Sequence, residues 1–234
     1  CEVEISGKGL KDLGVNYPFG FEISEKERVG GINGVSGDDT FFELEILAPN
    51  HDAVEVGVID SGIMEGHKYI APAINSSFSK SYIGSESSTA DKVKGGGHGT
   101  KVAGAILFPN GISGTANPYQ LPCYIRNLRV LNDYNHLENK FPAELMKIIV
   151  EDNQDCQIFN LSINSSIPFR KKHMSTWAAT IDSLINEKNI LFIISAGNIT
   201  KSDIKDFISK GKNYPEYLNT PYCKLANPAQ SSFA

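Results

Sequence analysis

Short apolar runs that alternate with helical patterns are the feature that most restricts how this chain can fold. Strands are predicted over residues 54–60, 125–131, 156–163 and 190–195, and helices over 98–107, from Pro142 and from Ser175. Strands that alternate with helices predict an α/β fold, a doubly wound and mostly parallel sheet with helices on both faces. In such sheets functional residues collect at the carboxyl ends of the strands.

Local signals refine these elements. The run 190–195 is nearly all apolar, which predicts a parallel strand covered on both faces. Asn127 is expected to interrupt the second strand. Pro142 occupies a favoured first-turn position, and Ser175 is a predicted N-cap. The predicted inner faces of these two helices comprise Leu145, Ile148 and Ile149 in the first, and Trp177, Ile181, Leu184 and Ile185 in the second.

Residues 1–50 differ from the rest of the chain. They contain a glycine-rich stretch at 30–34 and a segment with strand character at 40–47, and Pro49-Asn50 is typical of a boundary. We therefore expect residues 1–50 to form an N-terminal extension of unknown role, and residues 51–234 to form one α/β domain.

Composition excludes several classes of partner. A chain of 234 residues with 41% hydrophobic content can bury a sizeable core. The mixed charges sum to −5, so neither nucleic acid nor an anionic membrane is an expected partner. No apolar run reaches the length of a membrane span, and residues 1–4 lack the features of a secretory signal.

The cysteines indicate neither a metal site nor a disulfide framework. The four lie at Cys1, Cys123, Cys156 and Cys223, without a Cys-x-x-Cys pair. Cys123 and Cys156 lie in or beside predicted strands, where a buried free thiol is the expected state.

Two segments carry an acid and a base. Asp60 lies in residues 58–63 (Val-Ile-Asp-Ser-Gly-Ile), at the end of the first apolar strand. Alone, a carboxylate before Ser-Gly is more typical of a turn or helix cap; buried, it could orient an imidazole. His98, within Gly97-His98-Gly99-Thr100, opens a helix rich in small residues. It is either a packing residue or a base held in a fixed place by a closely packed helix.

A third segment offers an amide. Asn198 ends residues 195–198 (Ser-Ala-Gly-Asn), directly after the most apolar strand. Asparagine there is common in strand-end turns. Its side-chain amide could instead donate a hydrogen bond to the oxyanion of a tetrahedral intermediate.

In this order, the three segments resemble the aspartate, histidine and oxyanion-asparagine motifs of the subtilisin-like serine peptidases. Three further features are similar to that family: His67 shortly after the aspartate, Gly114-Thr115-Ala116 followed by 128–131 (Leu-Arg-Val-Leu), and Asn160-Leu161-Ser162. The resemblance covers about residues 55–234, and the histidine motif is its most specific part.

The resemblance implies a serine endopeptidase that hydrolyses peptide bonds, with Asp60, His98 and Asn198 as catalytic residues. It implies a polypeptide substrate that adds as an extended strand. The residues expected to bind this substrate are Ser162, Ile163 and Asn164 on one side, and Asn135, His136 and Leu137 on the other. No cofactor is evident, and structural calcium is allowed by the family resemblance only.

Two departures separate this chain from the family pattern. Asn164 stands where the substrate-binding strand usually has glycine, which is expected to narrow the pocket for the residue before the scissile bond. The Gly-Thr-Ser nucleophile segment, which in the family follows the oxyanion asparagine, does not occur in the sequence. We therefore expect the nucleophilic serine to lie beyond Ala234, in a C-terminal portion or a second chain that completes the domain, and this chain alone to be inactive.

Two alternatives stay open. A subtilase-like module without a serine would bind peptides and not cleave them. A nucleotide-binding α/β domain is disfavoured, because Asp60-Ser61-Gly62 stands where a glycine-rich phosphate loop would follow the first strand. Glycosylation sequons occur at Asn75, Asn160, Asn164 and Asn198. Since a glycan on Asn198 would abolish activity, a bacterial or cytoplasmic setting is favoured over a secreted one.

Overall fold

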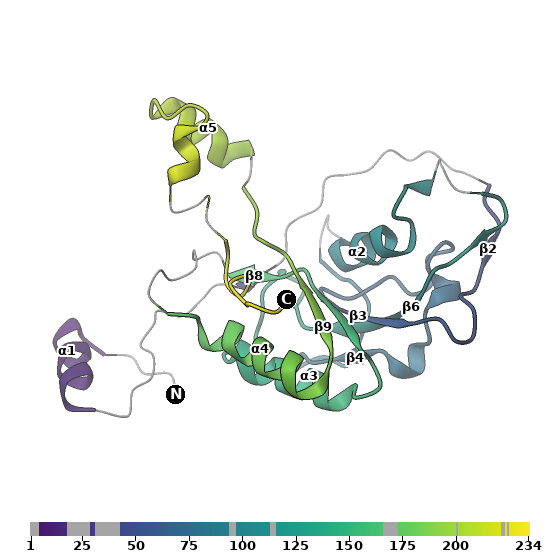
Figure 1. Ribbon diagram of the computed structural model, residues 1–234, viewed down its shortest axis with the longest axis horizontal. Coiled ribbons are helices and arrows are strands. Elements are labelled where there is room, and N and C mark those ends of the chain that lie inside the picture. The colour runs from purple at the N-terminus through teal and green to yellow at the C-terminus, as the bar shows by residue number, and fades with distance from the viewer. Residues whose placement is uncertain are drawn as a thin grey trace.

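A five-stranded parallel sheet forms the centre of the protein (Figure 1). The structure, a computed structural model, describes residues 5–17, 29–30, 43–93, 97–112, 116–165, 173–199, 201–220, 223 and 225–234. The strand order is β4-β6-β3-β7-β9. The strands are β3 (Glu55–Asp60), β4 (Lys80–Ser81), β6 (Tyr124–Arg129), β7 (Ile158–Leu161) and β9 (Leu191–Ile194). Their parallel registers confirm the predicted sheet.

Helices cover both faces of this sheet, as predicted. The helix α2 (His98–Leu107) packs on one face, and α3 (Pro142–Asp152) and α4 (Thr176–Lys188) pack side by side on the other (Figure 1). Successive side chains of a strand point to opposite faces of the sheet, so alternate residues pack against different helices. Val56 and Val58 join the core under α2, whereas Ile59 joins the core under α3 and α4.

Smaller elements surround the sheet. They are α1 (Gly7–Asn16), β1 (Val29–Gly30), β2 (Ile46–Leu47), β5 (Tyr119–Gln120), β8 (Asn164–Ser165), α5 (Lys201–Ser209) and the 3-10 helices η1 (Ala71–Ala73), η2 (Ser76–Phe78) and η4 (Glu216–Asn219). The pair β1–β8 is antiparallel and the pair β2–β5 is parallel. The helix α1 buries no residue and stands apart from the sheet, and α5 projects from it (Figure 1).

The helix start signals are confirmed, and the predicted inner face of α3 is right at Leu145 and Ile149 and wrong at Ile148. Pro142 is the first residue of α3, and the Ser175 hydroxyl caps α4 by accepting a hydrogen bond from the Ala178 amide at 3.1 Å. In α3, Met146 is buried while Ile148 is 40% exposed. The buried residues Leu145, Met146, Ile149 and Val150 form one stripe of the helix, from which Ile148 points away.

Two predictions about strands are also wrong. The strand β6 continues through Asn127, whose buried side-chain nitrogen donates to the Glu65 carboxylate at 2.7 Å and to the Thr89 carbonyl at 2.9 Å. The strand β9 is covered on one face only in the described part of the chain. Leu191 and Ile193 are 45% and 50% exposed, although Phe192 between them is fully buried.

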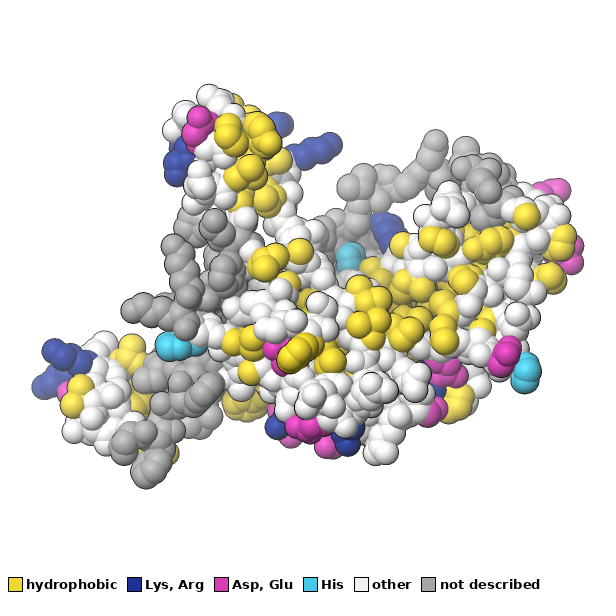
Figure 2. Space-filling model, in the orientation of Figure 1, with side chains coloured by type: hydrophobic (Ala, Val, Ile, Leu, Met, Phe, Trp, Pro, Cys, Tyr) yellow, Lys and Arg dark blue, Asp and Glu magenta, His cyan; other side chains and the backbone are white. Residues whose placement is uncertain are grey.

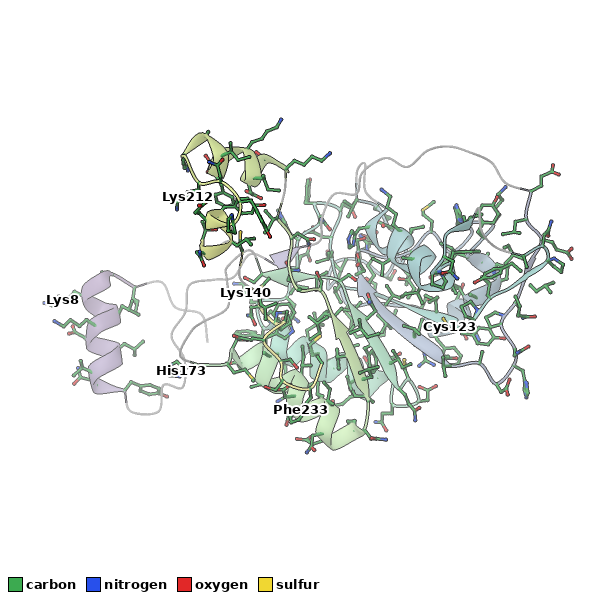
Figure 3. All side chains as sticks on the ribbon, turned by 45° about the horizontal axis from the view of Figure 1, so that its top comes forward. Lys8, Cys123, Lys140, His173, Lys212 and Phe233 are labelled. Atoms are coloured by element: carbon green, nitrogen blue, oxygen red, sulfur yellow. The ribbon has the colours of Figure 1, made fainter. Side chains whose placement is uncertain are left out.

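The main core is built by close packing between the central strands. The Phe159 and Phe192 rings stack with their centroids 5.3 Å apart. Gly57 makes room for Phe159 and Leu128, since a Cβ on Gly57 would lie 2.9 Å from side-chain atoms of both. Cys123, labelled at the start of β6 in Figure 3, is a buried free thiol, as expected. Among the described residues, no helix is long and apolar enough to cross a membrane.

Candidate active site

The strand β3 delivers Asp60 to the carboxyl end of the sheet. Its side chain is fully buried, and one carboxylate oxygen accepts a hydrogen bond from the Ser61 amide at 2.7 Å. The Asp60 carbonyl accepts a hydrogen bond from the Val130 amide at 2.9 Å, which ties the end of β3 to the residue after β6. These contacts hold the carboxylate in place at the end of the strand, where its oxygens accept hydrogen bonds.

The helix α2 delivers His98 at its first residue. Its second residue, Gly99, packs directly on the turn after β3: a Cβ on Gly99 would lie 2.2 Å from the Gly62 carbonyl oxygen. Gly62 itself has φ +104°, and a Cβ there would meet the Thr89 carbonyl oxygen at 2.5 Å. Gly99 therefore lets the start of α2 approach the β3 turn closely enough for the imidazole to reach the carboxylate, and Gly62 lets that turn pack against the backbone at Thr89.

His98 and Asp60 form a hydrogen-bonded pair. The His98 Nδ1 atom lies 2.9 Å from each carboxylate oxygen of Asp60, and the imidazole is 17% exposed. Because a carboxylate accepts hydrogen bonds, Nδ1 carries the proton and Nε2 is left to accept one. The pair thus has the tautomer that a general base needs.

A second carboxylate lies behind the pair. The Ser61 hydroxyl accepts a hydrogen bond from the Gly99 amide at 3.1 Å and donates one to the Asp91 carboxylate at 3.0 Å. The hydrogen bond that His98 donates to Asp60, more than any other contact, raises the pKa of His98; burial opposes this rise, and the charges of Asp60 and Asp91 add to it. Burial raises the pKa of Asp91, with a further contribution from the charge of Asp60.

Sequence reasoning missed two members of this arrangement. Ser61 was within a recognised motif but received no role, and its hydroxyl joins the β3 turn to the first turn of α2. Asp91 lies in a stretch without a motif. No sequence signal marks Asp91, since only the fold brings it to Ser61. Thr100, whose hydroxyl accepts a hydrogen bond from the Met64 amide at 2.9 Å, adds a further tie.

The predicted amide donor and one predicted substrate segment lie at the same end of the sheet. Asn198 follows β9 and is exposed, and residues 162–164 follow β7, the strand between β3 and β9. Ile163 is fully buried in the core, so its side chain is not available to a substrate. The Ser162 hydroxyl donates to the Asn160 side chain at 2.7 Å, and the Asn164 amide donates to the Ser195 hydroxyl at 3.1 Å.

The second predicted substrate segment lies on the other side of β3. Asn135, His136 and Leu137 form a turn after β6, in which the Asn132 amide bonds to the His136 carbonyl at 3.0 Å. Asn135 is buried with φ 62°, Leu137 is half-buried, and His136 is exposed. Two of the three side chains are therefore engaged in the turn and the core, and their part in binding stays a prediction.

The edge formed by residues 164–165 accepts an extended strand. Val29 and Gly30 of β1 pair antiparallel with Ser165 and Asn164 of β8. Backbone pairing of this kind is the contact that an extended peptide makes when it adds to a sheet edge. Of the segment predicted to bind substrate, Asn164 takes part in this pairing, and the role of the segment in binding stays a prediction.

A surface hollow and the arrangement of metal-binding side chains are two further features to compare with the predicted site. An open hollow of about 430 Å³ is lined by Glu43, Leu44, Glu45, Lys68 and Asn117, none of which is a predicted site residue. Within the described residues, no group of three or more His, Cys, Asp or Glu side chains is placed to hold a metal ion.

Comparisons with known proteins cover most of the chain after residue 50. The sequence model of the subtilase family matches residues 51–225. An uncharacterized protein of Sinorhizobium fredii, y4bN, is 32% identical over 94 residues, which cover 38% of this chain and 21% of that protein.

Solved structures are also similar. A lanthipeptide protease superposes with a TM-score of 0.50 at 22% identity, over 77% of this chain and 46% of its own. The epidermin leader peptide processing serine protease of Staphylococcus aureus superposes with a TM-score of 0.43 at 19% identity, over 72% of this chain and 43% of its own. The chain thus spans less than half the length of these proteases, and the likeness to the lanthipeptide protease supports the fold.

Proposed function

Because the chain belongs to the subtilase family, we propose that it forms the acid–base part of a serine endopeptidase that cleaves polypeptides through an acyl-enzyme. The observation that carries this proposal is the pair of Asp60 and His98, with a fully buried carboxylate 2.9 Å from the imidazole Nδ1. Burying a carboxylate costs free energy, which packing alone would not offset. A buried carboxylate that is hydrogen-bonded to a partly exposed imidazole is, however, the arrangement that proton transfer by the imidazole requires.

The chemistry follows from the protonation state of the pair. A serine hydroxyl placed at His98 Nε2 gives its proton to the imidazole as its oxygen attacks the substrate carbonyl. Asp60 stabilises the resulting imidazolium, and the raised pKa of His98 makes the imidazole a stronger base. The exposed Asn198 amide, together with a backbone amide, is proposed to hold the oxyanion. His98 then returns the proton to the leaving amine, and water releases the acyl group by the reverse sequence.

We propose that the serine comes from a segment outside these 234 residues. The exposed face of β9 supports this proposal, because Leu191 and Ile193 are about half exposed on a parallel strand. Such strands are normally covered on both faces. By strand alternation, these two side chains point away from the α3–α4 layer, toward the side that carries α2 and His98. Figure 2 shows hydrophobic side chains at the surface across the middle of the molecule and on the α5 lobe.

A serine-reactive phosphonate probe tests the proposal on the full-length protein. Wild-type protein should be labelled covalently at one serine, and His98→Ala should abolish labelling because no base remains to activate that serine. His67→Ala is the matched control: this histidine is exposed and makes an edge contact with Tyr69, 5.7 Å between ring centroids, so its loss should leave labelling unchanged. Absent labelling of the wild type, or labelling that survives in His98→Ala, would contradict the proposal.

The alternative is a subtilase-like module that binds peptides without cleaving them. The strand pairing between β1 and β8 favours it as far as binding is concerned, since that edge already holds an extended segment. The two proposals differ in the labelling experiment. A binding module captures peptides at this edge with no reaction toward the probe.

A further inference from the structure

We propose that Asn164 and Ser195 restrict this enzyme to substrates with a small residue, glycine, alanine or serine, immediately before the scissile bond. The proposal rests on the proposed peptidase function and adds the substrate class that the same site accepts. It is carried by side-chain contacts between the two segments that follow the neighbouring strands β7 and β9.

The position of this residue in the site follows from the chemistry. Its carbonyl carbon must lie beside His98, and its carbonyl oxygen must lie at Asn198. Its side chain, one bond away from that carbonyl, therefore lies over the backbone that leads to Asn198 and beside the segment after β7. Ligands of parallel α/β sheets bind in this region, outside the carboxyl ends of adjacent strands.

In this chain the region is spanned by a side chain. The Asn164 amide donates a hydrogen bond to the Ser195 hydroxyl at 3.1 Å, and both residues are half-buried. The Ser195 amide is itself bonded to the Leu161 carbonyl at 3.1 Å, so the two segments are joined by backbone as well as side chain. Asn164 therefore lies across the space that a bulky substrate side chain would need.

The base of the same region is also filled. Gly197 has φ +110°, and a Cβ there would lie 2.9 Å from the Cβ of Ala226. The Ala226 amide donates to the Ala196 carbonyl at 3.0 Å, and the next residue, Asn227, accepts from the Ser165 amide at 2.8 Å. Ala226 is 8% exposed and held between both segments, so it cannot withdraw to admit a larger group.

A small substrate residue fits above this bridge without disturbing it. A leucine or phenylalanine must displace Asn164 from Ser195 and leave both polar groups without their partner beneath an apolar side chain. Unpaired buried polar groups are what give the largest discrimination between substrates. We therefore expect kcat/KM for an alanine substrate to exceed that for the matching phenylalanine substrate by about a hundredfold.

The test uses the full-length protein and three peptides that differ only in alanine, leucine or phenylalanine before the cleaved bond. Asn164→Gly removes the bridge and should raise kcat/KM for the phenylalanine peptide about tenfold, with little change for the alanine peptide. Ser195→Ala removes only the acceptor and should act in the same direction with a smaller gain. Asn50→Gly, the same substitution at an exposed turn away from the site, should leave the preference unchanged.

The possible results distinguish a failure of the size restriction from a failure of the peptidase function on which it rests. Wild-type protein that cleaves the phenylalanine peptide as well as the alanine peptide overturns the size restriction, while the peptidase function stands. A preference for alanine that persists in Asn164→Gly overturns the role of the bridge. If no variant hydrolyses any peptide and none reacts with the serine probe, the peptidase function fails and the size restriction falls with it.

Discussion

Replacing Gly99 by alanine tests whether the close approach of α2 to the β3 turn sets the contact between His98 and Asp60. The added Cβ would lie 2.2 Å from the Gly62 carbonyl oxygen and 3.2 Å from the Cβ of Asp60. Real Cβ atoms essentially never come within 3.0 Å of another heavy atom, so α2 must retreat by about 0.8 Å. No rotamer relieves the clash, because it lies between a Cβ and backbone.

The retreat acts on the catalytic pair and on the fold. A 0.8 Å displacement applied to the 2.9 Å distance between His98 Nδ1 and the Asp60 carboxylate takes it beyond the range of a hydrogen bond. Misplacement of about 1 Å lowers catalytic rate about 10²-fold, and overpacking of this kind costs about 1–3 kcal/mol of unfolding free energy. The pKa of His98 should fall toward its ordinary value, since the hydrogen bond that His98 donates to Asp60 is the main cause of its rise.

The helix contains its own control. Gly104 lies in α2 with nothing within 4 Å of the position a Cβ would take. Gly104→Ala should therefore stabilise the protein by about 0.5–1 kcal/mol through helix propensity alone and leave the pKa of His98 unchanged. Urea unfolding measures the stability of both variants, and NMR titration of the imidazole measures the pKa. A Gly99→Ala protein with wild-type stability and an unshifted His98 titration would refute the reasoning.

Three further predictions concern the pair and the core. Asp60→Asn should lower the pKa of His98, and Asp91→Asn should lower it by less, because Asp91 acts through charge alone; NMR titration distinguishes the two. Since the folded pKa of His98 is raised, the stability that this charged pair adds is full below the unfolded value, about 6.5, and is lost as pH rises through the folded value. The unfolding free energies of wild type and Asp60→Asn should therefore differ most below that window and converge as pH rises through it, and a gap that widens with rising pH would show the sign to be wrong. Phe159→Ala should cost about 3–5 kcal/mol in urea unfolding, whereas Phe233→Ala, at a 64% exposed position, should cost little.

The fold could be predicted from the sequence for a physical reason, because apolar runs predict strands and strand ends predict where polar residues gather. The pairing of Asp60 with His98 was implied by the resemblance to the subtilisin-like peptidases, whereas the small residues beside His98 indicated only a closely packed helix. The hydrogen bonds that join Ser61 to Asp91 and to Gly99 could not be predicted from the sequence. Asp91 reaches Ser61 only because the folded chain brings the segment before α2 back over the β3 turn. A contact of this kind leaves no periodic signal.

The errors of the sequence-based prediction have a common cause. Asn127 was expected to interrupt the second strand, yet the strand continues and Glu65 and Thr89, from a distant part of the chain, accept hydrogen bonds from the Asn127 side-chain nitrogen. For β9, the apolar run was taken to show cover on both faces. Hydrophobicity records that a side chain favours burial and does not record which segment buries it. Leu191 and Ile193 are therefore apolar, as residues of a buried strand are, although their side chains lie on an exposed face of β9. On a sheet whose α2 side carries His98, that mismatch is the physical reason to look for the nucleophile on a segment that packs there.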